Sequence, residues 1–141
     1  MKKSIKDYLF VTIQILLFGL YFFDFLSSFY IPIIIKWIAF VVALFGLFIA
    51  LVSVFQLDKN LTVFPTPKQN ATLVTSGLYR FSRHPIYSGL LLFFFGYAFF
   101  ATSWFKILIA ILILLWFYLK TIFEEQQLVQ KYSNYTLYKK K

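Results

Sequence analysis

The sequence has no cysteine, a single histidine and only five acidic residues among its 141 positions. The absence of cysteine excludes disulfides, thiolate metal sites and cysteine nucleophiles. One histidine and five carboxylates are too few for the usual clusters of metal ligands, so we expect no metal site. Charged residues make up 13% of the chain, well below their share of roughly 25% in soluble domains.

The sequence is instead rich in apolar and aromatic residues. Hydrophobic residues make up 61% of the sequence and aromatic residues 23%, and the mean hydropathy is +0.78. A soluble domain of this length could not bury so much apolar surface, so we expect lipid to be its solvent. Backbone groups in lipid must satisfy one another within a segment. The expected fold class is therefore an all-α integral membrane protein.

Four apolar stretches predict about four transmembrane helices in a single membrane domain over residues 1–141. They cover about residues 8–26, 34–57, 85–101 and 104–119, and the last two are expected to form a helical hairpin. About 20 apolar residues cross a bilayer. The basic start followed by an apolar run could also be a signal peptide, but the run is too long and no small-residue cleavage site follows it.

The basic residues divide unequally between the two ends of these predicted helices. If the N-terminus is cytoplasmic, 12 of the 14 lysines and arginines lie on that side, and only Lys36 and Lys106 lie on the other. This positive-inside pattern predicts a multi-pass protein with cytoplasmic N- and C-termini. Attraction to anionic membrane lipids then accounts for the net charge of +9, so we expect no nucleic-acid partner.

Two polar segments are expected on the cytoplasmic side. Residues 58–84 form a long loop, which we expect to be ordered because "LVTSGLY" is apolar enough to lie on the protein, with a disordered connector as the alternative. From Trp104 to Lys131 there is no proline or glycine. The last helix should therefore continue beyond the bilayer, as a cytoplasmic helix over residues 120–138.

The scarce polar residues gather in two places on that same side. One is "GLYRFSRHPIYSG", which holds both arginines, the only histidine and two tyrosines, and the other is the pair Glu124 and Glu125. Pro85 suits the first turn of a helix, whose free N–H groups attract an anion. A ligand with a carboxylate, an ammonium, a sulfonium and an adenine ring would use all these groups, since aromatic faces attract a sulfonium. S-adenosylmethionine is such a ligand.

Each of these residues also has a simpler interpretation. The arginines could be interfacial anchors, the tyrosines part of an aromatic belt, His84 a helix cap and the two glutamates a solvated helix face. Gln14 and Asp24 are polar groups within the first apolar stretch, which makes them functional candidates. Asp24 lies so close to the far end of that stretch that we expect a wetted interface position.

The two motifs together resemble the isoprenylcysteine carboxyl methyltransferase family, to which the membrane phospholipid methyltransferases are related. The resemblance covers about residues 64–138, where "LVTSGLYRFSRHPIYSG" is followed by "EEQQLVQKYSNYTLY". It implies a membrane enzyme that transfers a methyl group from S-adenosylmethionine to a lipophilic or lipidated acceptor. That acceptor would be an isoprenylcysteine carboxylate or, alternatively, a phospholipid amine.

The resemblance also implies roles for individual residues. Arg83 would act as a catalytic residue that orients the acceptor, and Lys120 would help to hold it. Glu125 is a second catalytic candidate, because an amine acceptor has to lose a proton, to this carboxylate or to His84. The residues implied to bind the cofactor are Leu73, Val74, Tyr79, His84, Pro85, Ile86, Tyr87 and Glu124.

Two other functions stay open at this point. One is a non-catalytic membrane bundle that binds lipids or proteins, for which we expect no affinity for S-adenosylmethionine. The other is an enzyme like the membrane sterol reductases, which resemble this family in the cofactor region but use a nicotinamide cofactor. The pair Glu124 and Glu125 favours the methyl donor, and the chain is short for a reductase.

Overall fold

The computed structural model describes residues 2–140, and its secondary structure is helical. The helices are α1 (Ile5–Tyr21), α2 (Ile33–Leu57), α3 (Pro85–Phe100), α4 (Trp104–Lys131) and α5 (Tyr135–Lys139), with two 3-10 turns, η1 (Asp58–Asn60) and η2 (Gly77–Arg80). Over residues 2–140 there is no strand, only an isolated bridge between Ser28 and Ser103. The all-α expectation is confirmed.

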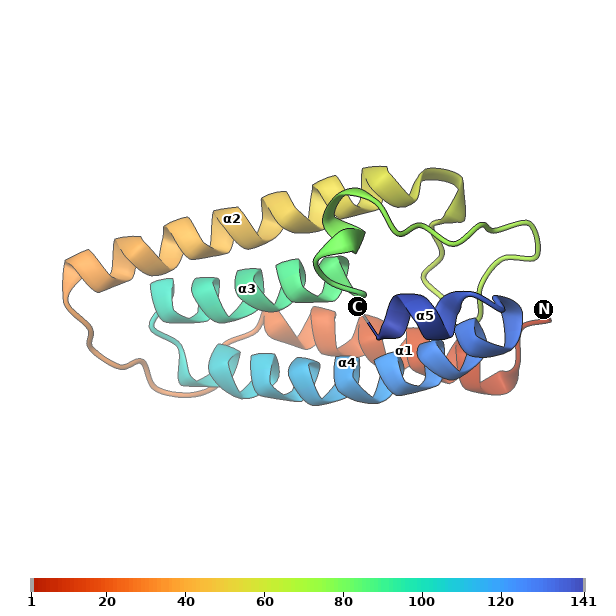
Figure 1. Cartoon of the computed structure of the whole chain (residues 1–141). Helices are drawn as coiled ribbons and strands as arrows, with labels where there is room; N and C mark the ends of the chain where they lie inside the picture. Colours follow the sequence, from red (N-terminus) through yellow and green to blue (C-terminus); the bar gives the residue numbers. More distant parts are fainter. Residues whose placement is uncertain (1, 141) are drawn as a thin grey trace.

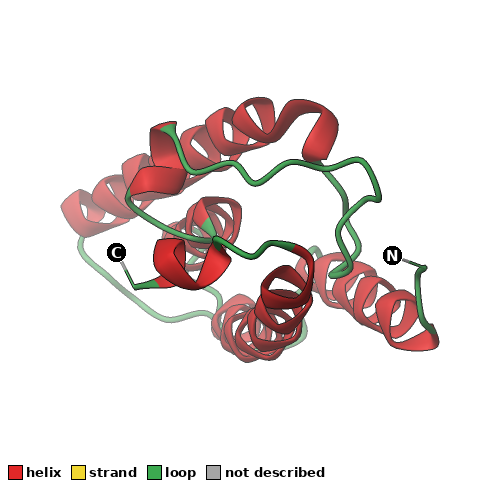
Figure 2. Ribbon diagram, turned by 45° about the vertical axis from the view of Figure 1, so that its right-hand side comes forward, coloured by secondary structure: helices red, strands yellow, loops and turns green. Residues whose placement is uncertain are grey.

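The long helices form a bundle with one elaborated end. Figure 1 shows α2, α3 and α4 running side by side, with α5 and the loop that follows α2 gathered at one end. Contacts join α2 to α3, α3 to α4, and α4 to α1. Seen from the turned view of Figure 2, the loop arches over this end of the bundle and α5 lies beneath it. The loop and the C-terminal segment therefore meet at the end of the bundle that holds the polar motifs.

Small residues let α2 and α3 approach each other closely. A Cβ atom added to Gly46 would lie 2.5 Å from the carbonyl oxygen of Gly89, and one added to Gly89 would lie 2.6 Å from the backbone nitrogen of Ala50. Lipid gives no hydrophobic drive for two helices to associate, so close backbone packing supplies the attraction. Side chains at Gly46 or Gly89 would force the two helices apart.

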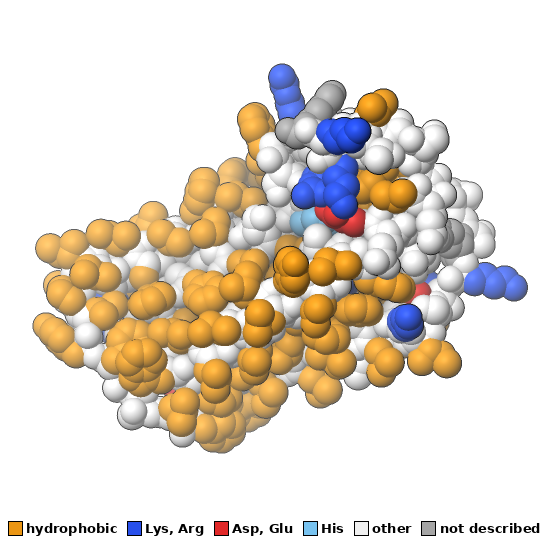
Figure 3. Space-filling model, turned by 60° about the horizontal axis from the view of Figure 1, so that its bottom comes forward, with side chains coloured by type: hydrophobic (Ala, Val, Ile, Leu, Met, Phe, Trp, Pro, Cys, Tyr) orange, Lys and Arg blue, Asp and Glu red, His pale blue; other side chains and the backbone are white. Residues whose placement is uncertain are grey.

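Many large apolar side chains are exposed on the long helices of the bundle. Two helical segments, Ile33–Asn60 and α4, are long and apolar enough to cross a membrane, whereas α1 and α3 are shorter, with 17 and 16 residues. Figure 3 shows apolar side chains covering the bundle and lysines and arginines gathered at one end, near acidic side chains and the histidine. This end includes the last part of α4, residues 120–131, which lies beyond its apolar stretch.

α1 ends at Tyr21, before the predicted span 8–26 does. The carbonyl groups at this helix end are bound by α4, because the ammonium of Lys106 donates to the carbonyl oxygen of Tyr21 at 2.6 Å. Asp24 lies in the connection that follows and accepts a hydrogen bond from the Ser103 hydroxyl at 2.9 Å. Asp24 therefore fastens the α1–α2 connection to the start of α4, at the opposite end from the polar motifs.

The helix predicted over residues 120–138 is broken in the structure. α4 continues to Lys131, as the absence of proline and glycine predicted, but residues 132–134 turn the chain before α5 begins. Tyr132 has an extended backbone, with φ −116° and ψ 114°, and its hydroxyl donates to the Ala71 carbonyl oxygen at 2.8 Å. This contact with the loop accompanies the turn, which brings α5 back over the end of the bundle.

The loop over residues 58–84 is ordered, as expected, and several helices hold it. The backbone N–H of Thr66 donates to Oδ1 of Asp7 at 2.9 Å, and the Lys120 ammonium donates to the Val63 carbonyl oxygen at 2.9 Å. These contacts favour an ordered loop over a disordered connector.

The last part of the loop is fixed to the end of α2. The Gln56 side chain accepts a hydrogen bond from the backbone N–H of Leu78 at 2.9 Å. Gly77 beside it has a φ of +62°, a backbone conformation that glycine adopts without strain, and a Cβ there would lie 2.6 Å from the Gln56 amide. This junction positions η2 and the residues that follow it.

Asp7 is the buried anchor of the loop, although the capping-box pattern that it forms with Ser4 marks only a helix start. Its carboxylate accepts hydrogen bonds from the Ser4 and Thr66 backbone N–H groups, and its side chain has no exposed surface. Burial alone would raise the pKa of Asp7, but the hydrogen bonds from Ser4 and Thr66 outweigh it and hold the pKa below its usual value. The carboxylate is therefore ionised when it holds the loop.

We expect Asp7→Ala to release the loop, because a hydrogen bond to a charged group contributes about 1.5–3 kcal/mol. Amide hydrogen exchange at Thr66 should become faster, while Lys6→Ala, a change at an exposed neighbour, should leave it unchanged. Because the folded-state pKa of Asp7 is lowered, its stabilisation is present above about pH 4 and is lost as the pH falls below that value. Unchanged protection of Thr66 in the Asp7 variant would contradict this role.

Candidate active site

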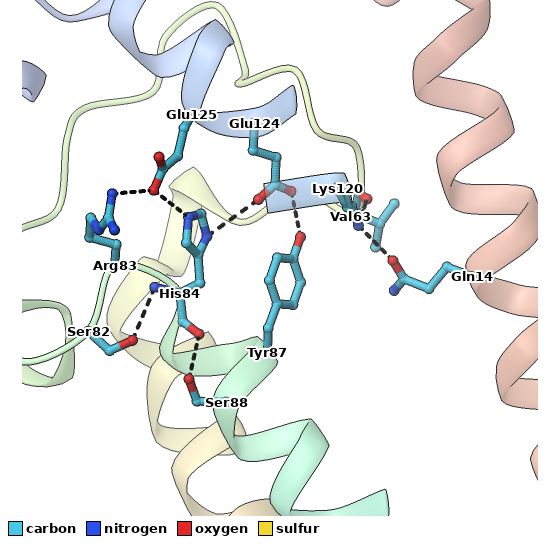
Figure 4. A network of polar contacts seen from close by, with 10 residues as sticks. All are labelled: Gln14, Val63, Ser82, Arg83, His84, Tyr87, Ser88, Lys120, Glu124 and Glu125. Atoms are coloured by element: carbon cyan, nitrogen blue, oxygen red, sulfur yellow. Dashed lines mark hydrogen bonds and ion pairs between the residues drawn. The ribbon is translucent and has the colours of Figure 1, made fainter. Parts of the chain in front are cut away.

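Two segments that are distant in the sequence meet at the elaborated end of the bundle. His84 precedes α3, and its Nδ1 lies 3.5 Å from Glu124 Oε2 on α4, while its Nε2 lies 3.4 Å from Glu125 Oε1. The Arg83 guanidinium donates to Glu125 Oε1 at 2.5 Å. Figure 4 shows these side chains pointing toward one another from α4 and from the start of α3. The two polar motifs of the sequence thus form one network.

Local backbone geometry holds His84 in this place. Pro85 occupies the first turn of α3, where its missing N–H costs no hydrogen bond. The backbone N–H of His84 donates to the Ser82 hydroxyl at 3.3 Å, and the Ser88 hydroxyl donates to the His84 carbonyl oxygen at 3.3 Å. The helix start therefore fixes the main chain of His84 and directs its imidazole toward α4 (Figure 4).

Tyr87 connects the histidine with the first glutamate. Its hydroxyl donates to Glu124 Oε1 at 2.5 Å, and its ring stacks on the His84 ring with centroids 5.6 Å apart and planes 6° apart. The Lys120 ammonium lies 5.3 Å from the centroid of the same ring. Since Lys120 and Glu124 are four residues apart on α4, they share one helix face. A cation, a carboxylate and two flat rings therefore line the same space.

Lys120 ties this face to the N-terminal helix. Its side chain is only 1% exposed, and its ammonium donates to Gln14 Oε1 at 2.7 Å and to the Val63 carbonyl oxygen at 2.9 Å. Gln14 was a functional candidate to which the sequence assigned no role. It is the partner of Lys120 on α1 (Figure 4).

A cavity of about 370 Å³ opens beside the network. This is within the range of about 300–1,000 Å³ that is usual for small-molecule sites. Nine of the eleven site residues predicted from the sequence line it: Leu73, Val74, Tyr79, Arg83, His84, Ile86, Tyr87, Lys120 and Glu124. Pro85 and Glu125 do not line it. Glu125 instead binds two cations, Arg83 and, at 2.7 Å, Lys139.

The C-terminal segment supplies walls of the cavity that the sequence analysis did not predict. Tyr132, Tyr135 and Tyr138 all line it. Tyr135 is 1% exposed, and among residues 2–140 neither its hydroxyl nor His84 Nε2 has a hydrogen-bond partner. The Tyr138 hydroxyl donates to the carbonyl oxygen of Tyr79. The tyrosine-rich end of the sequence carried this signal, but only the turn at residues 132–134 shows which tyrosines face inward.

The surroundings of Glu124 and Glu125 shift the pKa values of these two adjacent carboxyl groups in opposite directions. Burial raises the pKa of Glu124 to about 7, although Lys120 and the Tyr87 hydroxyl act in the opposite direction. Burial alone would also raise the pKa of Glu125, but Lys139 and Arg83 outweigh it and hold that pKa below its usual value. Glu124 is therefore close to its midpoint at neutral pH, whereas Glu125 stays ionised.

Burial also keeps the histidine uncharged. It lowers the pKa of His84, and the opposing effect of Glu125 does not fully restore it. The imidazole is therefore mostly neutral at pH 7, with a free lone pair on one nitrogen. Each ring nitrogen faces one carboxyl oxygen, so a proton taken up by the imidazole would be stabilised by Glu124 or Glu125.

A comparison with protein families identifies the relationship of the chain. The family model described as phospholipid methyltransferase matches residues 34–135, which are 102 of the 141 positions and include the whole network from Arg83 to Glu125. No curated protein and no solved structure matches the chain. The match is to the wider family and does not single out the isoprenylcysteine branch. The family model matches most of the chain, including both polar motifs that line the cavity. The chain therefore belongs to the phospholipid methyltransferase family of membrane methyltransferases.

Proposed function

We propose that this protein transfers a methyl group from S-adenosylmethionine to the amine of a membrane phospholipid. The observation that carries the proposal is the position of His84 at the wall of the cavity, with its two ring nitrogens 3.5 Å and 3.4 Å from Glu124 and Glu125. A headgroup amine carries a proton at neutral pH and has no free lone pair until that proton is lost. An uncharged imidazole is a suitable general base for this step.

The residues around the cavity fit S-adenosylmethionine. The Glu124 carboxylate suits its ammonium, the Tyr79 ring suits its sulfonium, and the apolar side chains of Leu73 and Val74 suit its adenine. The unpaired Tyr135 hydroxyl offers one more hydrogen bond. When bound, this cofactor supplies an electrophilic methyl group.

The chain's own residues would prepare the acceptor. His84 accepts the proton of the acceptor amine, and the imidazolium that forms is stabilised by Glu124 and Glu125. Arg83 lines the cavity and orients the acceptor, while Glu125 fixes Arg83 at 2.5 Å and acts as a positioning residue. Alignment of two reactants alone can lower a barrier by about 7–11 kcal/mol, so orientation is the larger part of the task.

We further propose that the chain crosses the membrane four times, with both termini on the side of the site. α2 and α4 have the required length, and α1 and α3 would cross as shorter partners. The gathering of lysines and arginines at the end that holds the site is in accord with the positive-inside rule (Figure 3). The acceptor lipid would then reach the site from the cytoplasmic leaflet.

Lys120 favours a second class of acceptor, an isoprenylcysteine carboxylate. Its ammonium uses two hydrogens on Gln14 and Val63, which leaves the third for an anion in the cavity. A carboxylate is already ionised and needs no general base. This acceptor would make His84 dispensable as a base, which separates the two proposals.

The test uses purified protein in vesicles with methyl-labelled S-adenosylmethionine. We expect label in phosphatidylethanolamine and none in phosphatidylglycerol, a matched lipid without an amine. Label in a farnesylated cysteine but not in phosphatidylethanolamine would establish the carboxylate acceptor instead. No donor binding in calorimetry and no transfer to any lipid would favour the non-catalytic bundle, and NADPH binding in its place would favour a reductase.

Donor binding should depend on pH through Glu124, because its ammonium contact requires the ionised carboxylate. With a pKa of about 7, the affinity for S-adenosylmethionine should fall by about 25-fold between pH 7.5 and pH 5.5. The stability of the free protein should respond with the opposite sign: a raised folded-state pKa favours folding at low pH, and that contribution is lost as the pH rises through 7.

Calorimetry at several pH values and thermal unfolding without donor would measure the two effects. Glu124→Gln is the control, since its residual affinity should change little over the same range. An affinity that stays constant in the unchanged protein would contradict a contact between Glu124 and the ammonium.

A further inference from the structure

A second hollow lies beside the cavity, and the proposed reaction leaves it unused. It is an open groove of about 810 Å³, lined by Thr75, Tyr79, Arg80, Phe81, Ser82, Arg83, Tyr138 and Lys139. Tyr79, Arg83 and Tyr138 also line the cavity. The groove and the cavity therefore adjoin along a shared wall that includes these three residues.

The groove carries an excess of positive charge. Arg83 and Lys139 both bind the Glu125 carboxylate, at 2.5 Å and 2.7 Å. Arg80 has no ion-pair partner among residues 2–140. Three cations thus share one carboxylate, which leaves two positive charges without compensation. Such a groove attracts an anion, and the hydroxyl of Ser82 adds a hydrogen-bond donor to it.

Phe81 indicates that this groove lies at the boundary of the membrane. Its side chain is 85% exposed, and it stands four residues before Pro85, where apolar α3 begins. An exposed aromatic ring beside arginines is typical of the layer where lipid headgroups meet the hydrocarbon. The anion that belongs at this depth is a lipid phosphate.

The proximity of groove and cavity gives the phosphate a place in the reaction. A cavity of about 370 Å³ is of a size for one nucleoside-sized ligand, so the headgroup of the acceptor needs its own binding surface. In a phosphatidylethanolamine headgroup only two carbons separate the phosphate ester oxygen from the amine. A phosphate in the groove would therefore hold the amine close to the shared wall, where Arg83 stands beside His84.

We propose that the groove binds the phosphate of the acceptor lipid, with Arg80 and Lys139 as its main ligands. The inference rests on the proposed function for the identity of the acceptor, but the binding of a lipid phosphate does not depend on catalysis. The groove should bind a lipid phosphate more tightly than free phosphate. Both carry negative charge, but only the lipid has acyl chains that enter the membrane beside Phe81.

The first experiment measures binding in the absence of methyl donor. Protein in neutral detergent micelles is titrated with dihexanoyl phosphatidic acid and, separately, with inorganic phosphate. We expect Arg80→Gln to weaken binding of the lipid at least tenfold and Arg80→Lys to restore part of it. Lys59→Gln, which removes an exposed charge outside the groove, should change it less than twofold. Equal lipid binding by the unchanged protein and Arg80→Gln would overturn the proposal, as would equal affinity for lipid and inorganic phosphate.

The second experiment connects the groove to the reaction. For Arg80→Gln we expect the KM for phosphatidylethanolamine to rise about tenfold, whereas the KM for sphingosine, an amine without phosphate, and the affinity for S-adenosylmethionine stay unchanged. Weaker donor binding in this variant, or the same rise for both amines, would overturn the assignment. If no amine is methylated by the unchanged protein, the proposed function fails, while the first experiment still decides whether the groove binds a lipid phosphate.

Discussion

In the Glu124→Gln variant we expect the affinity for S-adenosylmethionine and the rate of methyl transfer each to fall at least about 100-fold. Glu124 is the carboxylate that faces the cavity, and its side chain is only 14% exposed. Removing one partner of a buried ion pair costs about 3–5 kcal/mol, since the other charge is left without compensation. Glutamine keeps the shape and can still accept the Tyr87 hydroxyl, so the fold should persist.

Calorimetry with the donor and labelled transfer in vesicles would measure both losses. Asp58→Asn serves as the matched control: it also exchanges a carboxylate for an amide at this end of the bundle, but at an exposed residue outside the cavity. Donor affinity in Glu124→Gln within threefold of the unchanged protein would remove the proposed contact with the ammonium.

The second large effect is expected in Arg83→Ala, in which methyl transfer should fall on the order of 100-fold or more. Arg83 lines the cavity and is held by Glu125. Its loss removes the cation that orients the acceptor and leaves Glu125 with Lys139 alone among its strong partners. Arg83→Lys should recover only part of the rate, because an ammonium keeps the charge but lacks the planar fork of the guanidinium.

Labelled transfer would give the rates, and the yield of folded protein in membranes would show that both variants insert. Normal turnover in Arg83→Ala would contradict the proposal that Arg83 orients the acceptor. A loss that Arg83→Lys restores completely would mean that only the charge matters and that bidentate geometry does not.

The sequence was sufficient to predict those features that depend on composition or on a local motif. Hydropathy predicted the helical bundle, the lack of proline and glycine predicted that α4 continues to Lys131, and Pro85 predicted the start of α3. The motif around His84 and the pair at Glu124 were predicted to lie close together, and the contacts between them confirm that proximity. Their roles in binding and catalysis stay predictions.

Other features depend on contacts between distant residues and have no local signature. Asp7 reads as a charged residue in a first helical turn, and only the arrival of Thr66 makes it a buried anchor. Likewise, nothing near Tyr132 in the sequence shows that Ala71 will accept its hydroxyl where the chain turns. The spacing of Glu124 and Glu125 could not show which of them faces the cavity, because that depends on the rotation of α4 about its own axis.

The contact between α2 and α3 determines which parts of the molecule are free to move when ligands exchange. The main chains of α2 and α3 are in close contact at Gly46 and Gly89, which leaves no room for one helix to slide along the other. The two helices should therefore move as one rigid unit. The loop and α5 are held instead by side-chain contacts, such as the hydrogen bond from Tyr138 to Tyr79 and the ion pair between Lys139 and Glu125. We therefore expect the rate of product release to depend on the opening of the loop and α5, and not on a movement of α2 relative to α3.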